Sequence, residues 1–433
     1  MGGSSSNGGV HILDILKDRG FFFQCTDEAA LRKVLDLSVP GCKPVTLYVG
    51  FDATAESLHV GNLTALMAMR HFQATGHRVV ALAGGATTLI GDPTDRTDLR
   101  KMLTRGQIAA NVECIKSNFR QFLQFDGSDG PRVALKASAP VHSSLLVNNL
   151  DWLGELNYLE FLRDYGVHFS VNRMVAQDSV KLRMEKGLTF LEFNYSLLQA
   201  FDFMHLNKVM GCSLQCGGAD QWGNIVAGVD LTRRMNQKEV FGLTFPLLTT
   251  ADGKKMGKTA SGAVWLSADL LKPYDYYQYW VNVDDAMVET LLKRFTEVPL
   301  DQIAELCREG GAALRKAKET LAFEATRLCH GDVEALKARE GAKAAFGGGG
   351  DVSQMPTHEM SETEVGLIRL ADLFVRAGLC SSKGQFRSEL GKGVRINDEV
   401  IADIGRVVQR SDLGQDRSCL LRLGKKAMRI VVK

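Results

Sequence analysis

The stretch Thr46-Leu-Tyr-Val-Gly-Phe-Asp52, followed by His59-Val-Gly-Asn62, decides the fold prediction. The first run is apolar and β-rich, whereas residues 63–69, Leu-Thr-Ala-Leu-Met-Ala-Met, are mostly good helix formers. His59 and Gly61 are therefore predicted to lie at a strand-to-helix turn. The free N–H groups and the helix dipole at such a turn favour phosphate, and a glycine allows a flat base to lie against the main chain.

A second segment, Lys255-Met-Gly-Lys-Thr259, brings two ammonium groups suited to holding a departing pyrophosphate. Each motif is weak alone, because a lone His59 is more often a helix-cap histidine and a Lys-rich run is usually a solvated loop. A Walker A loop is excluded, because Gly253 and Gly257 enclose three residues where that motif needs four. The pair in this order, about two hundred residues apart, favours an ATP site without a P-loop.

Between the two motifs, Tyr195, Gln199 and Asp202 are spaced i, i+4, i+7. At about 100° per residue, this spacing places them in one sector of a helix whose other residues are largely apolar. A polar stripe on such a helix needs partners. A bound ligand and a hydrogen-bonded core network both remain open from these residues alone.

The two motifs resemble the HxGH and KMSKS signatures of the class I aminoacyl-tRNA synthetases, and the chain is most similar to the bacterial and organellar tyrosyl-tRNA synthetases. The resemblance runs from about Leu47 to the C-terminus. It rests also on the matched segments Tyr48–Asp52, Gly91–Pro93, Phe169–Met174, Phe193–Tyr195, Gln199–Asp202 and Gly217–Asn224. Two departures stand out: Asn62 replaces the second signature histidine, and Gly257-Lys258-Thr259 replaces Ser-Lys-Ser. Because an amide still donates hydrogen bonds, we expect Asn62 to change the rate without abolishing activity.

The resemblance implies an α/β fold: a Rossmann-like doubly wound parallel sheet, followed by an α-helical domain and a small α+β RNA-binding domain. Independently, residues 74–85 read as a helix end, a strand and a Gly-rich turn, which completes a β-helix-β unit. The implied activity is ligation: L-tyrosine and ATP form tyrosyl-adenylate, and the tyrosyl group moves to the 3′ end of tRNA(Tyr). Mg²⁺ is expected as a partner of ATP and not as a protein-caged ion. A homodimer is also implied.

The resemblance further assigns residues to parts of the site. Tyr48 and Asp202 are implied at the phenolic hydroxyl, and Asp92, Tyr195 and Gln199 at the α-amino group. The substrate-binding set is completed by Gly50, Asp52 and Asn149. The residues implied at the departing pyrophosphate are Thr54, His59, Lys255 and Lys258. Those implied at ATP also include Gly61, Asn62, Gly218, Asp220 and Gln221, with Asp220 on the ribose. Gln221 is implied to orient the reacting carboxylate, and the expected tRNA contacts are Arg96, Arg100, Lys383 and Arg387.

Composition sets the outer bounds. A chain of 433 residues with 45% hydrophobic residues suggests two to four globular domains. Nine cysteines without paired spacing favour reduced thiols, and Cys212 and Cys216 lack a second pair, so no structural metal is expected. The sequence contains no apolar run of membrane length and no secretory signal, which favours the cytoplasm and leaves a mitochondrial or plastid matrix open.

The predicted organisation has six parts. They are a flexible N-terminus (1–9), the catalytic domain (10–262) with a helical dimer-forming insertion (113–187), a helical anticodon-binding domain (263–345), a linker (346–361) and an α-L RNA-binding module (362–433). The net charge is only +2, but residues 362–433 carry 14 Lys and Arg against 9 Asp and Glu. This basic balance favours RNA, although a merely solvated basic face remains open.

Two rival functions remain at this stage. A related nucleotidyltransferase could join ATP to another small acid, but it would not need a basic RNA module. A pure RNA-binding or splicing role would not need the tyrosine pocket. Tyrosine-dependent pyrophosphate exchange separates all three.

Overall fold

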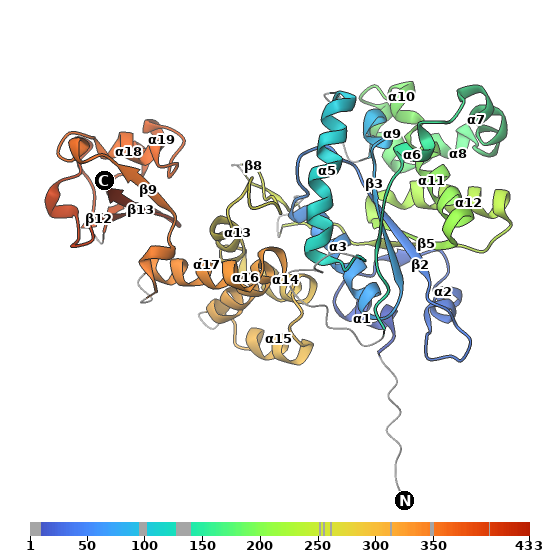
Figure 1. Cartoon of the computed structure of the whole chain (residues 1–433), viewed down its shortest axis with the longest axis horizontal. Coiled ribbons are helices and arrows are strands. Elements are labelled where there is room, and N and C mark those ends of the chain that lie inside the picture. The colour runs from blue at the N-terminus through green and yellow to red at the C-terminus, as the bar shows by residue number, and fades with distance from the viewer. Residues whose placement is uncertain are drawn as a thin grey trace, which may run out of the picture. The chain divides into compact units, whose positions relative to one another are not determined.

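The structure is a computed structural model, and it describes residues 10–94, 102–126, 140–250, 253, 256–259, 262–311, 314–346, 350–397 and 399–433. Of residues 178, 179, 258 and 259 it describes the backbone only. The chain divides into two compact units, residues 1–272 with 279–331, and residues 273–278 with 332–433. Figure 1 shows the elements of both units.

Unit 1 is built on a six-stranded sheet with the order β1-β6-β5-β2-β3-β4 (Figure 1). The strands are β1 (Gln24–Cys25), β2 (Thr46–Phe51), β3 (Arg78–Ala83), β4 (Leu145–Asn148), β5 (Cys212–Gly218) and β6 (Phe241–Phe245). All neighbours are parallel except β1, which pairs antiparallel with β6. The predicted doubly wound sheet is confirmed. The chain order reverses between β2 and β5, and ligands bind at such a switch point, outside the carboxyl ends of the strands.

Helices cover this sheet. The helices that position the site are α3 (Val60–Ala74), α5 (Arg105–Phe122), α11 (Tyr195–Met210) and α12 (Trp222–Asn236). The smaller ones are α1 (Ile12–Asp18), α2 (Glu28–Leu35), α4 (Thr87–Ile90), α6 (Leu150–Leu153), α7 (Tyr158–Asp164), α8 (Val171–Val175), α9 (Asp178–Met184) and α10 (Phe190–Phe193). The predicted helix with Tyr195, Gln199 and Asp202 is thus confirmed as α11. It ends at Gly211, whose φ of 69° suits a residue without a Cβ.

The segment 113–187, predicted to be helical, begins within α5 as a helix but is interrupted by a strand. Residues 145–148 form β4, an edge strand parallel to β3, and α5 starts before the predicted insertion, at Arg105. The short run Leu-Leu-Val-Asn is too brief to show a period, so only pairing with β3 decides its conformation.

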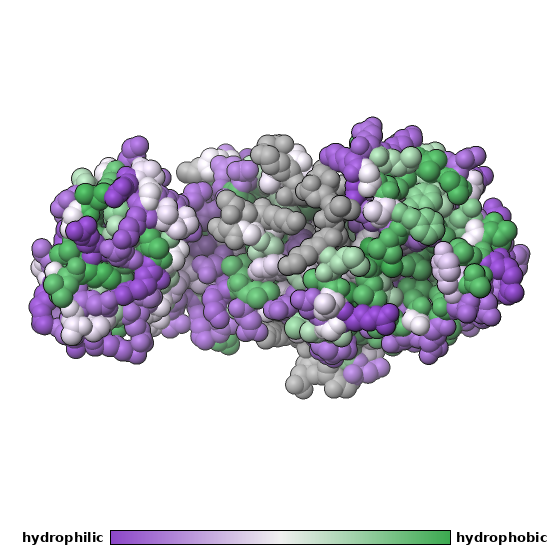
Figure 2. Space-filling model, turned by 90° about the horizontal axis from the view of Figure 1, so that it is seen from above, coloured by the Kyte–Doolittle hydropathy of each residue, from purple (hydrophilic) through white to green (hydrophobic). Residues whose placement is uncertain are grey.

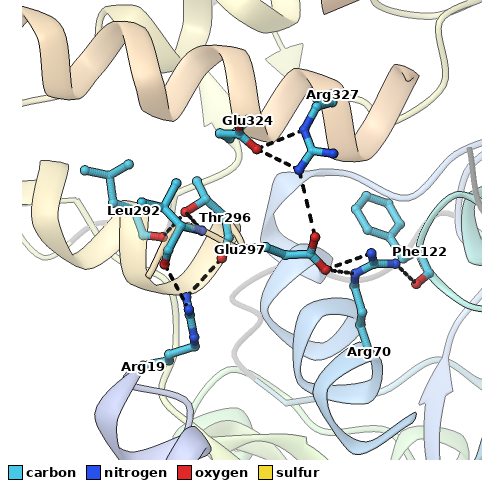
Figure 3. Close-up of polar contacts among 9 residues, drawn as sticks. Arg19, Arg70, Phe122, Leu292, Thr296, Glu297, Glu324 and Arg327 are labelled. Carbon is cyan, nitrogen blue, oxygen red and sulfur yellow. Dashed lines mark hydrogen bonds and ion pairs between the residues drawn. The ribbon is translucent and has the colours of Figure 1, made fainter. Parts of the chain in front are cut away.

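A second group of helices follows the catalytic sheet: α13 (Pro273–Val281), α14 (Val288–Phe295), α15 (Leu300–Cys307), α16 (Leu314–His330) and α17 (Asp332–Ala345). Figure 3 shows how Glu297, just after α14, meets Arg70 of α3. Arg70 is buried, donates from Nε to Glu297 Oε1 at 2.9 Å, and donates from Nη1 to the Phe122 carbonyl at 2.9 Å. Arg19 donates to the Lys293 and Thr296 carbonyls at the end of α14, which the helix leaves unpaired, and to the Val298 carbonyl just beyond it.

Unit 2 contains a five-stranded sheet with the order β11-β10-β12-β13-β9. Its elements are β9 (Thr357–Met360), α18 (Leu370–Arg376), α19 (Lys383–Glu389), β10 (Val394–Ile396), β11 (Glu399–Val400), β12 (Ser418–Leu423) and β13 (Lys426–Val432). In this unit β10 and β11 pair antiparallel as a hairpin that follows the two short helices α18 and α19. Phe374 of α18 and Phe386 of α19 meet edge to face in its core, with ring centroids 5.1 Å apart.

The predicted linker over residues 346–361 is wrong for its second half. Residues 357–360 form β9, which pairs parallel with β13, and Met355 packs with Ala345 and Ala427. The run Thr-His-Glu-Met is polar because β9 is an edge strand, with Met360 buried and its first and third residues exposed. Within the described residues, no helix is both long and apolar enough to span a membrane.

Candidate functional site

A cavity of about 640 Å³ opens where the carboxyl ends of β2 and β5 meet the start of α3 and one side of α11. Fourteen of the residues predicted from the sequence line it: Tyr48, Gly50, Asp52, Thr54, His59, Gly61, Asn62, Asp92, Tyr195, Gln199, Asp202, Gly218, Asp220 and Gln221. Segments far apart in the sequence are thus brought together. Their charges and hydroxyl groups divide the cavity into three chemically distinct parts.

The first part pairs a phenol with a buried carboxylate. The Asp202 carboxylate accepts hydrogen bonds from Trp152 Nε1 at 2.7 Å and from Asn149 Nδ2 at 3.0 Å. Burial nevertheless raises the pKa of Asp202 to about 7. Tyr48 is 1% exposed, and its buried hydroxyl has no hydrogen-bond partner among the described residues. Burial and the Asp202 charge raise the pKa of this phenol. Both groups therefore have hydrogen-bonding capacity suited to a ligand hydroxyl.

Asn149 holds the Asp202 carboxylate in place from outside the cavity. It is fully buried, does not line the cavity, and donates to both Asp202 and the Thr87 hydroxyl, the latter at 3.0 Å. Thr87 in turn donates to Asp52 at 2.9 Å. Asn149 also accepts from the Ala86 N–H at 2.8 Å. This chain of bonds positions the two carboxylates in the cavity wall.

The second part lies around Asp92 and Gln221. Gln221 Nε2 donates to Asp92 Oδ2 at 2.6 Å, and Asn224 Nδ2 donates to Gln221 Oε1 at 3.1 Å. Asp92 also accepts from the Thr94 N–H at 2.9 Å. These bonds orient one carboxylate and one amide beside Tyr195 and keep the Gln221 amide available to a second acceptor, since an amide nitrogen has two hydrogens.

The third part is the turn at the start of α3. His59 is the N-cap, as the plainer interpretation of the sequence predicts: its Nδ1 accepts from the Gly61 N–H at 3.0 Å, and Asn62 Oδ1 accepts from the His59 N–H at 3.1 Å. This capping box uses the oxygen of Asn62 and leaves its amide N–H groups for a ligand. The cap does not exclude phosphate binding, because the turn and Thr54 line the same cavity.

Several predicted residues are not tested by this geometry. Lys255, Arg96 and Arg100 lie outside the described residues, as does the side chain of Lys258. Lys383 and Arg387 lie on α19 of unit 2, where Lys383 pairs with Asp372 at 2.5 Å.

Sequence reasoning missed Trp152, Thr87 and Gln215. Gln215 lines the cavity, and its buried Oε1 has no hydrogen-bond partner among the described residues. A polar residue inside the apolar strand Leu214-Gln-Cys216 was the available signal. Across the described ranges, no group of three or more His, Cys, Asp or Glu side chains could hold a metal ion.

Comparison with known proteins agrees with this site. Residues 41–347 match the tRNA synthetases class I (W and Y), and residues 350–431 match the tyrosine–tRNA ligase SYY-like C-terminal domain. The chain is 50% identical to a tyrosine–tRNA ligase of Caulobacter vibrioides over 408 residues, which covers 93% of each chain. It is 44% identical to that of Clostridium perfringens, covering 96% of this chain and 98% of the relative.

A solved structure is also similar. The C-terminally truncated mitochondrial tyrosyl-tRNA synthetase of Aspergillus nidulans superposes with a TM-score of 0.66 at 30% identity, covering 78% of this chain and 95% of the other. The fold and the site therefore define a class I aminoacyl-tRNA synthetase. Within that class, the chain belongs to the tyrosine–tRNA ligases, which activate tyrosine and charge tRNA.

Proposed function

We propose that the tyrosine side chain binds with its phenolic hydroxyl between Tyr48 and Asp202. The observation that carries this assignment is the buried Tyr48 hydroxyl, which has no partner among the described residues and lines the same cavity as Asp202. The substrate α-amino group would bind to Asp92, Tyr195 and Gln199. The Asp92 carboxylate can accept hydrogen bonds from this positively charged group.

At the opposite end, the tyrosine carboxylate would attack the α-phosphorus of ATP. One P–O bond forms to the carboxylate and one breaks to release pyrophosphate. A carboxylate is already ionised at neutral pH, so the protein supplies position and charge and needs no side-chain nucleophile. Gln221 would orient the carboxylate, and Asp220 and Gly218 would receive the adenosine. Thr54, His59, Lys255 and Lys258 would hold the pyrophosphate, and Mg²⁺ would arrive with ATP.

Exchange of labelled pyrophosphate into ATP tests the activation step directly. We expect exchange that requires L-tyrosine and stops when tyrosine is omitted. A nucleotidyltransferase for another acid would exchange only when that acid replaces tyrosine, and a protein that only binds RNA would not exchange at all.

The affinity for tyrosine should depend on pH through Asp202. Its pKa is about 7, because burial and the Asp52 charge outweigh the hydrogen bonds from Asn149 and Trp152. The phenolic O–H donates to the ionised form, so binding favours the deprotonated carboxylate. The dissociation constant should therefore rise as the pH falls below about 7, approaching tenfold per pH unit, and should be flat above it. His205, stacked on Trp152, has its pKa lowered by burial and by Lys208.

Equilibrium dialysis between about pH 5.5 and 8 measures this profile. Asp202→Asn is the control and should remove the dependence. A flat profile for the unaltered protein would contradict the assignment of Asp202.

We further propose that the protein is a homodimer. Helices α7 to α10 and the turn between them leave large apolar side chains exposed, and Figure 2 shows hydrophobic residues gathered on this face. The most exposed are Leu159 at 73%, Val167 at 72% and Phe190 at 70%. Exposed apolar patches mark interfaces, and a second copy is the partner that the resemblance to the tyrosyl-tRNA synthetase family implies.

Sedimentation of Leu159→Asp and Phe190→Asp should show monomers where the unaltered protein is dimeric. Leu367→Asp is the matched control, because Leu367 of unit 2 is equally exposed at 77%. A dimer that survives both interface substitutions would exclude this face.

Unit 2 is proposed to contribute to tRNA affinity through phosphate contacts of α19. Lys383 is the first residue of this helix, and Arg387 lies in its last turn. Reversing both charges should weaken tRNA binding and flatten its salt dependence, while tyrosine-dependent pyrophosphate exchange remains unchanged. Reversal of Arg234, an exposed cation of α12, is the control.

Deletion after Gly350 is a harsher test of the same idea, because it also uncovers Ala345, which packs with Met355 and Ala427. Normal charging at physiological salt by the reversed variant would contradict a role for α19 in tRNA binding. Loss of pyrophosphate exchange would instead make unit 2 a structural part of the catalytic body.

The cellular location is proposed to be the cytoplasm, as the bacterial relatives suggest. A mitochondrial or plastid matrix is the alternative. Cell fractionation with an antibody against the chain distinguishes them.

A further inference from the structure

The loop that carries Lys258 is joined to the ATP-binding turn by backbone hydrogen bonds. The Val60 N–H donates to the Val264 carbonyl at 2.9 Å, and the Leu266 N–H donates to the Leu58 carbonyl at 2.9 Å. Val264 in turn donates to the Gly257 carbonyl at 2.9 Å. Residues 264–266 therefore run beside the turn before α3, and Gly257 is the next point of attachment.

Gly257 also contacts the turn directly. Its φ is +100°, and a Cβ built on it would lie 2.7 Å from the Gly61 nitrogen and 3.3 Å from His59 Nδ1. The nearest of these atoms belongs to the backbone at the start of a helix, which cannot swing aside as a flexible side chain would. The absence of a side chain at position 257 is therefore a condition for this close approach.

A third attachment comes from α13. The Tyr279 phenol accepts a hydrogen bond from the main chain of Gly257, although burial raises its pKa to about 12. Tyr279 lies in the same compact unit as Gly257 and Gly61. Gly257 is thus held on one side by the ATP-binding turn and on another by a tyrosine of the helical region.

We infer that Gly257 and Tyr279 are positioning residues for pyrophosphate release: together they seat the loop so that Lys258, the next residue, is delivered to the phosphates. This inference rests on the proposed role of Lys258. Gly257→Ser, which would restore the third residue of the KMSKS signature, should therefore slow this enzyme, because the side chain displaces the loop from Gly61. A misplacement of about 1 Å is enough to cost about 10²-fold in rate.

The test measures adenylate formation at saturating ATP in Gly257→Ala. We expect the rate constant to fall about 10²-fold, with the tyrosine dissociation constant unchanged. Gly262→Ala is the matched control, because Gly262 lies in the same loop with φ +115° and a Cβ there meets nothing within 4 Å. Gly262→Ala introduces the same kind of backbone strain at a positive φ but no contact with Gly61. Its rate constant for adenylate formation should stay within about threefold of that of the unaltered enzyme.

Tyr279→Phe keeps the ring and removes only the hydroxyl, so it should lower the same rate constant about fivefold, the effect of one neutral hydrogen bond. Transfer to tRNA from separately supplied tyrosyl-adenylate should remain normal in both variants, because no pyrophosphate is then present. Equal losses in both steps, equal losses in Gly257→Ala and Gly262→Ala, or a normal rate in Gly257→Ala would each overturn the inference. If Lys258→Ala also forms the adenylate at the normal rate, the proposed role of Lys258 is wrong. If Lys258→Ala is slow while Gly257→Ala is normal, only the inference about Gly257 and Tyr279 is wrong.

Discussion

Replacing Asp202 with Asn is expected to weaken the preference for tyrosine over phenylalanine about 10- to 150-fold. The carboxylate accepts from Asn149 and Trp152, and an amide in its place would turn a donor toward one of them while weakening the bond to the substrate hydroxyl. Hydrogen bonds to charged groups are worth about 1.5–3 kcal/mol, so kcat/KM for tyrosine should fall about 10- to 150-fold. The value for phenylalanine should change little, and so should the KM for ATP.

Tyr48→Phe should produce the same pattern at about tenfold or less, because it removes a neutral donor. Tyrosyl-tRNA synthetases are the known example of a site that rejects phenylalanine because its buried polar groups would be left unpaired. Their discrimination against phenylalanine is about 10⁵-fold, and the magnitude is taken from that example. The measurement is kcat/KM for both amino acids in pyrophosphate exchange. Asp301→Asn, at an exposed position on α15, controls for the charge change. Equal losses for both amino acids and for ATP affinity would disprove the pocket assignment.

The second large effect is expected from the lysines of the signature loop. Lys255→Ala and Lys258→Ala should each slow adenylate formation about 10²- to 10³-fold, the usual cost of removing one group that stabilises developing charge. Tyrosine affinity should stay nearly unchanged, because pyrophosphate leaves only in the transition state.

Rapid-quench kinetics separates these quantities. Lys254→Ala is the matched control, since Lys254 adjoins the signature but is not part of it. If a lysine variant shows only a higher dissociation constant for tyrosine, the lysine belongs to substrate binding and not to the reaction at phosphorus.

The order of the central elements was predictable because their local signals agree with their tertiary environment. β2 is a buried apolar run, α3 begins at a capping residue, and α11 carries one polar sector. The two short edge strands were not predictable. β4 was read as helix and β9 as linker, since an edge strand of four residues is stabilised by its neighbour and shows almost no pattern of its own.

Within the site, the sequence by itself determined which polar groups are present: the tyrosine and aspartate proposed for the phenol, the glycine turn proposed for ATP, and the lysines proposed for the phosphates. Only the tertiary structure decided how they are supported. Asn149 and Trp152 come from segments about fifty residues before Asp202, and their bonds to it depend on how β4 and α6 pack against α11. The contact between Gly257 and Gly61 likewise joins positions about two hundred residues apart. Local propensity carries no information about such distances, because burial and close approach arise only when the chain is folded.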